Sequence, residues 1–223
     1  MKTKTRCVLA VIGCLTLLPM AHAERFLDQA AFRDARADLQ AQPQPGYVWF
    51  RRSCLRYNSL NPDLLILGDS IMDGWSGYAL HVFPRLFIDA KVGRQFSGGV
   101  RQYARLLAYK PIRQIQTIVV ELGTNGPVKA SQVGAFMRMV GFQRKVIFVI
   151  PEVPRPWERE VQQLYENLPK EYGNVHLVYW NRLSTHNGKE IPAYFGGDGV
   201  HPDWKGIQVM MHGIQAALAA EKG

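Results

Sequence analysis

Short, almost continuous apolar runs alternate along the chain with stretches in which apolar residues recur at helical spacing. The runs predict five strands, at residues 64–67, 88–92, 117–122, 146–150 and 175–180. The other stretches predict helices near residues 97–109, 129–140, 156–171 and 203–221. Continuous apolar strands separated by helices are typical of a parallel sheet that is covered on both faces. The pattern therefore predicts an α/β fold, in which ligands bind beyond the carboxyl ends of the strands.

The segment before the first strand, residues 24–62, is predicted to be an N-terminal helical lead-in to one catalytic domain that spans residues 24–223. Its first part, residues 24–41, has the apolar spacing of a helix, which Pro43 and the residues after it end. Periodicity assigns no conformation to residues 47–62, which we expect to pack ahead of the first strand.

The first 23 residues predict a secretory signal peptide. Three basic residues precede an apolar run at residues 7–20, and Ala21-His22-Ala23 follows it. The run is too short to span a bilayer comfortably as an anchor. The residues before Cys14 loosely resemble a lipidation site, but the apolar run continues past Cys14, which favours cleavage after Ala23 and a secreted or periplasmic protein.

Composition fits a folded protein, with 47% hydrophobic and 20% charged residues. Removal of the predicted signal peptide lowers the formal net charge from +9 to +6. It also leaves Cys54 as the one remaining cysteine, so we expect a fold that is held by its core without an intramolecular disulfide. The spread of positive charge fits either contact with an anionic envelope polymer or an ordinary solvated face. No basic and aromatic pattern of a nucleic-acid module is visible, and we expect a monomer.

Ser70 is the first candidate catalytic residue, because it follows the first predicted strand directly in the run Gly68-Asp69-Ser70. A strand-to-helix turn lifts a serine hydroxyl out of the sheet and places backbone amides near it. The same tripeptide also suits a plain helix cap, since Asp and Ser are favoured N-cap residues. Ser70 alone therefore leaves both interpretations open.

A second candidate is the loop Asp198-Gly199-Val200-His201, just before the last helix. A carboxylate three residues before a histidine can hold the imidazole through its Nδ1 proton, which leaves Nε2 free as a general base. The alternative is a turn with an Asp cap and an incidental histidine.

Two further candidates follow predicted strands. Asn125, in Gly123-Thr124-Asn125-Gly126, can aim its amide at the oxygen of a tetrahedral intermediate, although Asn-Gly is also a common turn pair. Gly93 can offer a backbone N–H to the same oxygen, because glycine permits close approach by a substrate.

These four motifs, in this order at four strand ends, resemble the SGNH hydrolase superfamily, whose sequence blocks supply Ser, Gly, Asn and His. The resemblance implies a three-layer α/β/α sandwich around a five-stranded parallel sheet, with no metal or organic cofactor. It also implies a Ser70–His201–Asp198 triad and an oxyanion hole made of Ser70, Gly93 and Asn125.

A narrower resemblance is to the extracytoplasmic SGNH domain of bacterial peptidoglycan O-acetyltransferases. It is carried by residues 88–95, 120–126, 153–155, 174–178 and 194–195. In that family the domain follows a membrane-embedded acyltransferase module that delivers acetyl groups. The 223 residues contain no such module and begin with the predicted signal peptide, so the acetyl donor stays open.

The resemblance implies acyl transfer, chiefly of acetyl, to or from a cell-envelope glycan, with a separate membrane acyltransferase as the partner that supplies acetyl groups. A secreted acetyl esterase, lipase or thioesterase would use the same residues with water. A non-catalytic glycan-binding protein on the same fold is the third hypothesis, and the intact triad counts against it. Five side chains that could shape the open face have core or surface packing as the favoured role: Trp75, Tyr78, Arg94, Arg155 and Trp157.

Overall fold

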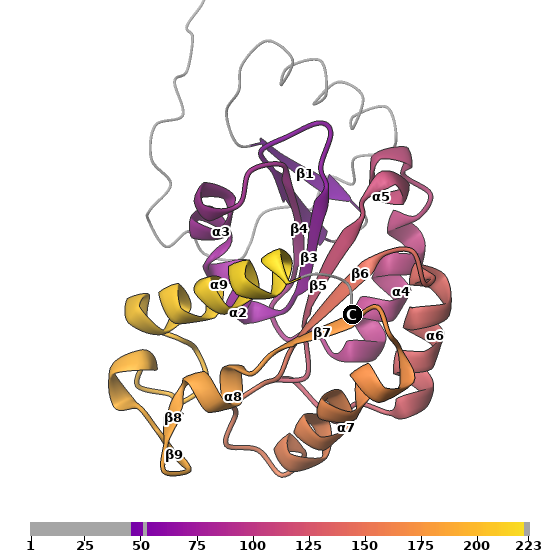
Figure 1. Ribbon diagram of the computed structural model, residues 1–223. Coiled ribbons are helices and arrows are strands. Elements are labelled where there is room, and N and C mark those ends of the chain that lie inside the picture. The colour runs from indigo at the N-terminus through magenta and orange to yellow at the C-terminus, as the bar shows by residue number, and fades with distance from the viewer. Residues whose placement is uncertain (1–45, 51–52, 221–223) are drawn as a thin grey trace, which may run out of the picture.

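The structure is a computed structural model that describes residues 46–50 and 53–220 (Figure 1). The predicted signal peptide and the predicted helix at residues 24–41 lie outside the described residues.

A seven-stranded sheet forms the centre of the described part of the chain. Its strand order is β1-β2-β4-β3-β5-β6-β7. The strands are β1 (Gly46–Phe50), β2 (Ser53–Tyr57), β3 (Leu64–Gly68), β4 (Leu86–Ala90), β5 (Thr117–Glu121), β6 (Lys145–Val149) and β7 (Val175–Val178). All neighbouring pairs from β4 to β7 are parallel, which confirms the predicted five-stranded parallel sheet.

The strand predicted at residues 88–92 lies two residues earlier, at Leu86–Ala90. Leu86 and Phe87 are fully buried and belong to the strand, whereas Lys91 is exposed and begins a turn that is closed by a hydrogen bond from Arg94 N to Lys91 O (3.1 Å). The sequence interpretation therefore counted the start of that turn as strand.

The prediction of a helical lead-in is wrong over residues 46–50 and 53–57, where β1 and β2 extend the sheet as antiparallel strands. In β2, Leu55 and Tyr57 are buried against one face of the sheet. Arg56, between them, donates to Asp73 on the other side (2.9 Å). This in-and-out alternation marks a strand, but over five residues it is too short to stand out from the aromatic residues around it.

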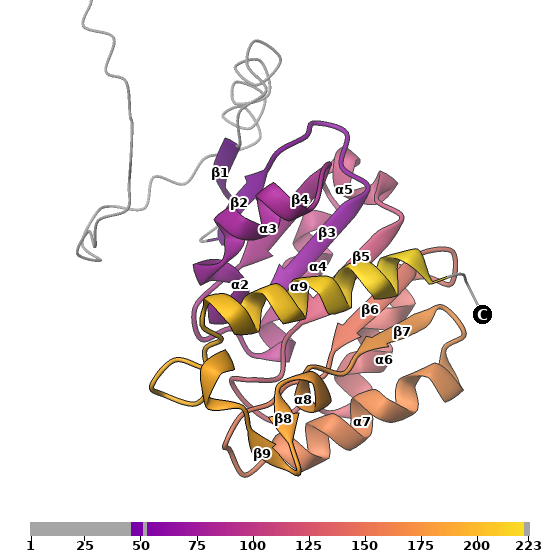
Figure 2. The ribbon, with the colours of Figure 1, turned by 60° about the vertical axis from the view of Figure 1, so that its left-hand side comes forward.

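Helices cover both faces of the sheet, which confirms the predicted three layers. One face packs against α4 (Phe96–Leu106), α6 (Ala130–Val140) and α7 (Glu158–Glu171). The other packs against α2 (Ser70–Gly74), α3 (Ser76–Val82) and α9 (Trp204–Ala219). Figures 1 and 2 show α9 crossing the sheet on the face opposite α4 and α6. The shorter elements are α5 (Lys110–Gln114), α8 (Trp180–Leu183), β8 (Thr185–His186), β9 (Lys189–Glu190) and the 3-10 turn η1 (Pro192–Tyr194).

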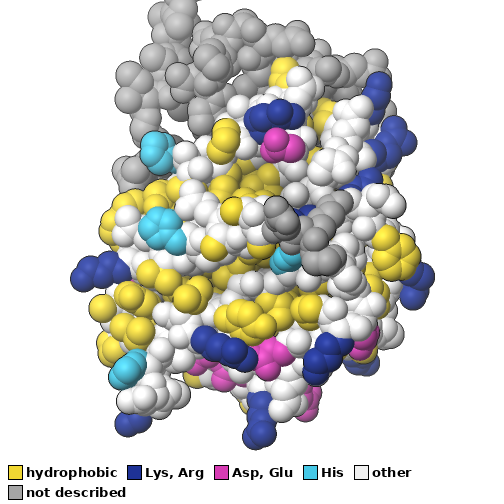
Figure 3. Space-filling model, viewed as in Figure 1, with side chains coloured by type: hydrophobic (Ala, Val, Ile, Leu, Met, Phe, Trp, Pro, Cys, Tyr) yellow, Lys and Arg dark blue, Asp and Glu magenta, His cyan; other side chains and the backbone are white. Residues whose placement is uncertain are grey.

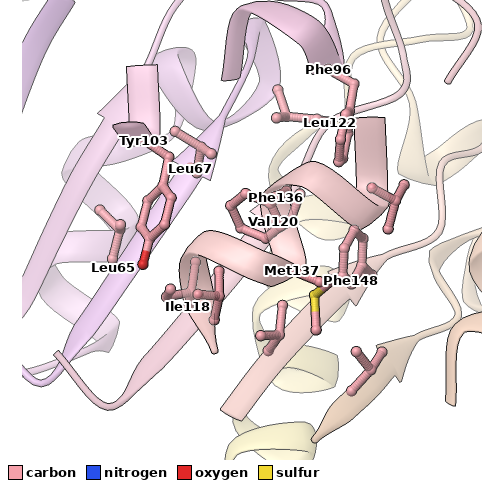
Figure 4. Close-up of a cluster of buried hydrophobic side chains, with 14 of the residues drawn as sticks. Leu65, Leu67, Phe96, Tyr103, Ile118, Val120, Leu122, Phe136, Met137 and Phe148 are labelled. Atoms are coloured by element: carbon pink, nitrogen blue, oxygen red, sulfur yellow. The ribbon is translucent and has the colours of Figure 1, made fainter. Parts of the chain in front are cut away.

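The core holds β3 firmly in the middle of the sheet, because every residue of that strand is buried. Leu65 and Leu67 belong to the cluster under α4, α6 and α7, where aromatic rings such as Phe96 and Phe136 meet (Figure 4). Ile66 belongs to the cluster under α9. The residue that follows this strand is therefore set on a rigid support.

Basic side chains are spread over the face seen in Figure 3 and do not gather there into one patch. In the part of the chain that the structure describes, no helix is both long enough and apolar enough to cross a bilayer.

Candidate active site

Ser70 is the first residue of α2, directly beyond the carboxyl end of β3. Asp69 caps this helix, because its carboxylate accepts the backbone N–H of Ile71 (3.1 Å). Gly68 is needed for the sharp turn, since a Cβ there would lie 2.5 Å from the Cβ of Met72. The cap and the nucleophile interpretations of Gly-Asp-Ser are thus compatible: Asp69 caps the helix, and Ser70 presents its hydroxyl at the first turn.

His201 and Asp198 meet Ser70 from the loop between η1 and α9. The Oγ of Ser70 lies 2.9 Å from Nε2 of His201, and Nδ1 of His201 lies 2.6 Å from Oδ2 of Asp198. The other oxygen of Asp198 accepts the backbone N–H groups of Val200 and His201, both at 3.0 Å. Three hydrogen bonds therefore fix the carboxylate, and the carboxylate fixes the ring.

The loop that carries His201 is tied to α2 and to itself. The indole N–H of Trp75 donates to the carbonyl of Pro202 (3.0 Å). The backbone N–H of Gly196 donates to the carbonyl of His201 (2.7 Å), and Phe195 pairs with Pro202 in an isolated antiparallel bridge. These contacts hold the imidazole over the start of α2 independently of the hydrogen bond to Ser70.

Gly93 and Asn125 lie on either side of Ser70 by topology. Strand β3 pairs with β4 on one side and with β5 on the other, and all three run in the same direction. The loops that follow β4 and β5 carry Gly93 and Asn125, so both loops flank the turn at Ser70. Gly93 has φ of +70°, a conformation that side chains rarely adopt, and it is exposed.

The Asn125 side chain is oriented by Asp69: its Nδ2 donates to Oδ2 of Asp69 at 3.0 Å. A primary amide has two N–H donors, so one remains for another acceptor. Asp69 thus links the serine turn to the asparagine loop, a link that the sequence reasoning did not foresee.

Glu121 is a second group that sequence reasoning missed. It ends β5, is only 4% exposed, and accepts the backbone N–H of Asp69 (3.3 Å). Burial raises the pKa of Asp69 to about 6, although hydrogen bonds from Ile71, Thr124 and Asn125 lower it in part. Burial and the neighbouring Asp69 carboxylate hold the pKa of Glu121 well above its usual range. Both effects favour the protonated form of Glu121 beneath the serine turn. The sole sequence signal was one charged residue in an apolar strand.

The candidate triad is open to solvent. The side chains of His201 and Asp198 are 47% and 53% exposed. The hydrogen bonds from His201 and from two backbone amides hold the pKa of Asp198 below its usual range, so the carboxylate is ionised across the neutral range. An ionised Asp198 favours the imidazole tautomer that keeps the proton on Nδ1 and leaves Nε2 free to accept one from Ser70.

The five side chains that the sequence offered as candidates for shaping the open face differ in burial and in contacts. Arg94 is buried against Asp89, and Trp157 donates to the carbonyl of Gly123 (3.2 Å). Arg155 is exposed. Trp75 and Tyr78 pack with Trp204, which is 51% exposed.

His176 lies in the edge strand β7 and is partly buried. Among the described residues, no group of three or more His, Cys, Asp or Glu side chains is arranged to hold a metal ion.

Comparison with known proteins adds sequence relatives. No protein-family model matches the chain. The O-acetyltransferase A of Staphylococcus aureus is 32% identical over 149 residues, which cover 66% of this chain and 23% of that protein. A Bacillus subtilis protein provisionally named a peptidoglycan O-acetyltransferase is 33% identical over 158 residues, which cover 70% of this chain and 24% of that protein. The chain thus spans about a quarter of the length of the curated relatives it matches.

Solved structures agree on the fold. The C-terminal catalytic domain of Streptococcus pneumoniae peptidoglycan O-acetyltransferase A superposes with a TM-score of 0.60 at 16% identity, covering 72% of this chain and 94% of that one. A GDSL-like lipase from Bacteroides thetaiotaomicron gives a TM-score of 0.57 at 18% identity, covering 86% of this chain and 98% of that one. The chain therefore has the SGNH hydrolase fold and is homologous to one part of the bacterial O-acetyltransferases.

Proposed function

We propose that the protein is a serine-dependent O-acyltransferase or esterase, with acetyl as its acyl group and a cell-envelope glycan as its substrate. The observation that carries the proposal is the unbroken hydrogen-bonded chain from Ser70 through His201 to Asp198. A serine hydroxyl is a weak nucleophile until a positioned base takes its proton, and this chain supplies the base and the group that orients it.

The first step forms an acyl-enzyme. As the Oγ of Ser70 attacks the ester carbonyl, its proton passes to Nε2 of His201, and the ionised Asp198 stabilises the imidazolium. The backbone N–H groups of Ser70 and Gly93 and the remaining amide N–H of Asn125 stabilise the oxyanion of the tetrahedral intermediate. Collapse of the intermediate expels the alcohol, which takes the proton back from His201.

The second step removes the acyl group from Ser70. A sugar hydroxyl gives its proton to His201 while its oxygen attacks the acyl carbonyl, and Ser70 leaves with that proton. No metal or organic cofactor enters either step. The acceptor glycan and the acetyl group are inferred from the names of the homologous O-acetyltransferases. A signal peptide cleaved after Ala23 would deliver the protein to the envelope, where a membrane acyltransferase is the partner that supplies acetyl groups.

Hydrolysis by the same residues is the alternative. It is favoured by the exposure of His201 and Asp198, because water can approach the acyl-enzyme as readily as a sugar can. An acetyl esterase would release the acetyl group as acetate in the second step and would otherwise follow the same chemistry.

One experiment tests both versions. The purified full chain and its Ser70→Ala variant are incubated with a chromogenic acetyl ester, with and without glycan oligomers. Acetylated oligomers in the wild-type reaction alone would support transfer, and release of acetate alone would support hydrolysis. If Ser70→Ala turns over the ester as fast as the wild type, the proposed function is wrong.

A further inference from the structure

A basic pocket adjoins the candidate oxyanion loop. It has a volume of about 320 Å³ and lies between the loop after β4 and the side of α4 that runs from Ser97 to Arg105. This volume falls near the lower end of the range for small-ligand sites. The pocket is lined by Lys91, Val92, Gly93, Arg94, Gln95, Ser97, Gly98, Arg101, Gln102 and Arg105. Four of these side chains are cationic and none is acidic.

Three of the four cationic side chains of this pocket are not neutralised by a neighbouring acidic side chain among the described residues. Arg94 is buried and paired with Asp89, which also accepts from Gln102 (2.7 Å), so its charge is balanced. Lys91, Arg101 and Arg105 are exposed. Within residues 55–220, none of these three side chains has an ion pair or a hydrogen bond. Three like charges around one hollow repel one another, and an anion bound among them would relieve that repulsion.

Helix α4 shapes the pocket to admit a ligand. Arg101 and Arg105 are four residues apart and therefore project from the same side of the helix. Gly98 lines the pocket beside Arg101, since a Cβ there would lie 3.9 Å from the Nη2 of Arg101, an ordinary contact distance. Guanidinium groups in an open hollow can bind a carboxylate or a phosphate through two parallel hydrogen bonds.

The pocket adjoins the candidate active site at Gly93. Gly93, whose N–H is a proposed oxyanion donor, lines it. Gln95, another lining residue, packs over Gly126, since a Cβ at residue 126 would lie 3.2 Å from Nε2 of Gln95. Gly126 follows Asn125 directly. If a molecule is bound at Ser70 and extends past Gly93, its next chemical group would therefore lie in the basic pocket.

We propose that this pocket is a subsite for an anionic group on the acyl acceptor, next to the hydroxyl that receives the acyl group. The proposal rests on the proposed function and narrows its substrate class to glycans that carry a carboxylate or a phosphate. Lys91 and Arg101 attract the anion, and Arg105 binds it from the following turn of α4.

Binding to the Ser70→Ala variant of the full chain tests the subsite apart from catalysis. Three oligomers of equal length are titrated by calorimetry: a neutral N-acetylhexosamine oligomer, the same oligomer with a carboxylate, and the same oligomer with a phosphate. At least one anionic oligomer should bind about tenfold more tightly than the neutral one, and salt should weaken this preference. The anion that binds more tightly identifies the source of the charge.

Two further variants serve as comparison. Arg101→Gln/Arg105→Gln should lose the preference for the anionic oligomer and keep the wild-type thermal unfolding midpoint. Arg113→Gln removes an exposed arginine from α5, which lies before the amino end of β5, whereas the pocket follows the carboxyl end of β4; this variant should bind all oligomers as the parent does.

Equal binding of neutral and anionic oligomers would overturn the subsite. So would a preference that survives in Arg101→Gln/Arg105→Gln, or binding to anionic lipid vesicles without binding to any oligomer. Because the titration needs no turnover, its result stands even if Ser70→Ala and wild type hydrolyse acetyl esters equally and the proposed function fails.

Discussion

The buried acid under the serine turn leads to an unusual prediction: Glu121→Gln should stabilise the protein. Glu121 accepts the backbone N–H groups of Asp69 and Met72 and shares a hydrogen bond with the Asp69 side chain. If Glu121 is protonated, glutamine replaces it almost atom for atom. The amide oxygen accepts the same two N–H groups, and the amide N–H replaces the acid proton toward Asp69.

The magnitude follows from proton linkage. The pKa of Glu121 in the fold is raised by burial and by Asp69, whereas in the unfolded chain it has the ordinary value of 4.5. The contribution of the protonated Glu121 side chain to the free energy of unfolding is fully present below pH 4.5. It is lost as the pH rises toward the pKa that Glu121 has in the folded protein. The loss amounts to about 1.4 kcal/mol per pH unit until that pKa is reached, and is constant above it. Glutamine cannot lose a proton, so the free energy of unfolding of Glu121→Gln should exceed that of the wild type by an amount that grows with pH at the same rate.

Urea unfolding between pH 4.5 and pH 8 measures this difference. Glu121→Gln should match the wild type near pH 4.5 and gain on it steadily toward neutral pH. Glu171→Gln, an exposed acid at the end of α7, should differ from the wild type by at most about 0.5 kcal/mol at every pH. Glu121→Ala should lose about 1–3 kcal/mol, because buried N–H groups stay unpaired. An advantage that does not grow with pH, or a Glu121→Gln protein less stable than the wild type, would show that Glu121 is ionised in the fold.

Three other substitutions test the site and its support. Asp198→Asn should lower kcat for an acetyl ester by about 10³–10⁴ with little change in folding, because the amide favours the wrong tautomer of His201; a loss below tenfold would count against the triad. Asn125→Ala should lower kcat by about 10²–10³ in the same assay, and an unchanged kcat would remove it from the oxyanion hole. Arg94→Gln should destabilise the fold by about 3–5 kcal/mol in urea unfolding, because it leaves the carboxylate of Asp89 buried without its cation; a loss under 1 kcal/mol would refute that ion pair.

The parts of the site that follow strands could be predicted from the sequence. Parallel strands end at one edge of a sheet, so placing Ser70, Gly93 and Asn125 after three strands already predicted their proximity. The spacing of Asp198 and His201 predicted their contact, because residues three apart on a tight loop lie close together. The structure brings the triad groups within hydrogen-bonding distance, as the order of the motifs suggested.

The missed features depend on partners distant in sequence. Glu121 and Asp69 are separated by 52 positions, and nothing in the local pattern of either strand links the two carboxyl groups. The basic pocket combines residues of a loop with two arginines a turn or more into α4, which individually resemble ordinary solvated charges. Strand β2 became recognisable only once its pairing with β4 was known, because Leu55 and Tyr57 alternate with polar residues for too few positions to define a period.

Mass analysis of the acyl-enzyme tests the central claim most directly. The purified protein is mixed with an excess of an activated acetyl ester, quenched in acid within the first turnovers, and digested for peptide sequencing by mass spectrometry. We predict one acetyl group on the hydroxyl of Ser70, and none on the corresponding peptide of Ser70→Ala. Rapid turnover of the ester with Ser70 unmodified, and equal turnover by Ser70→Ala, would contradict the assignment of Ser70 as the nucleophile.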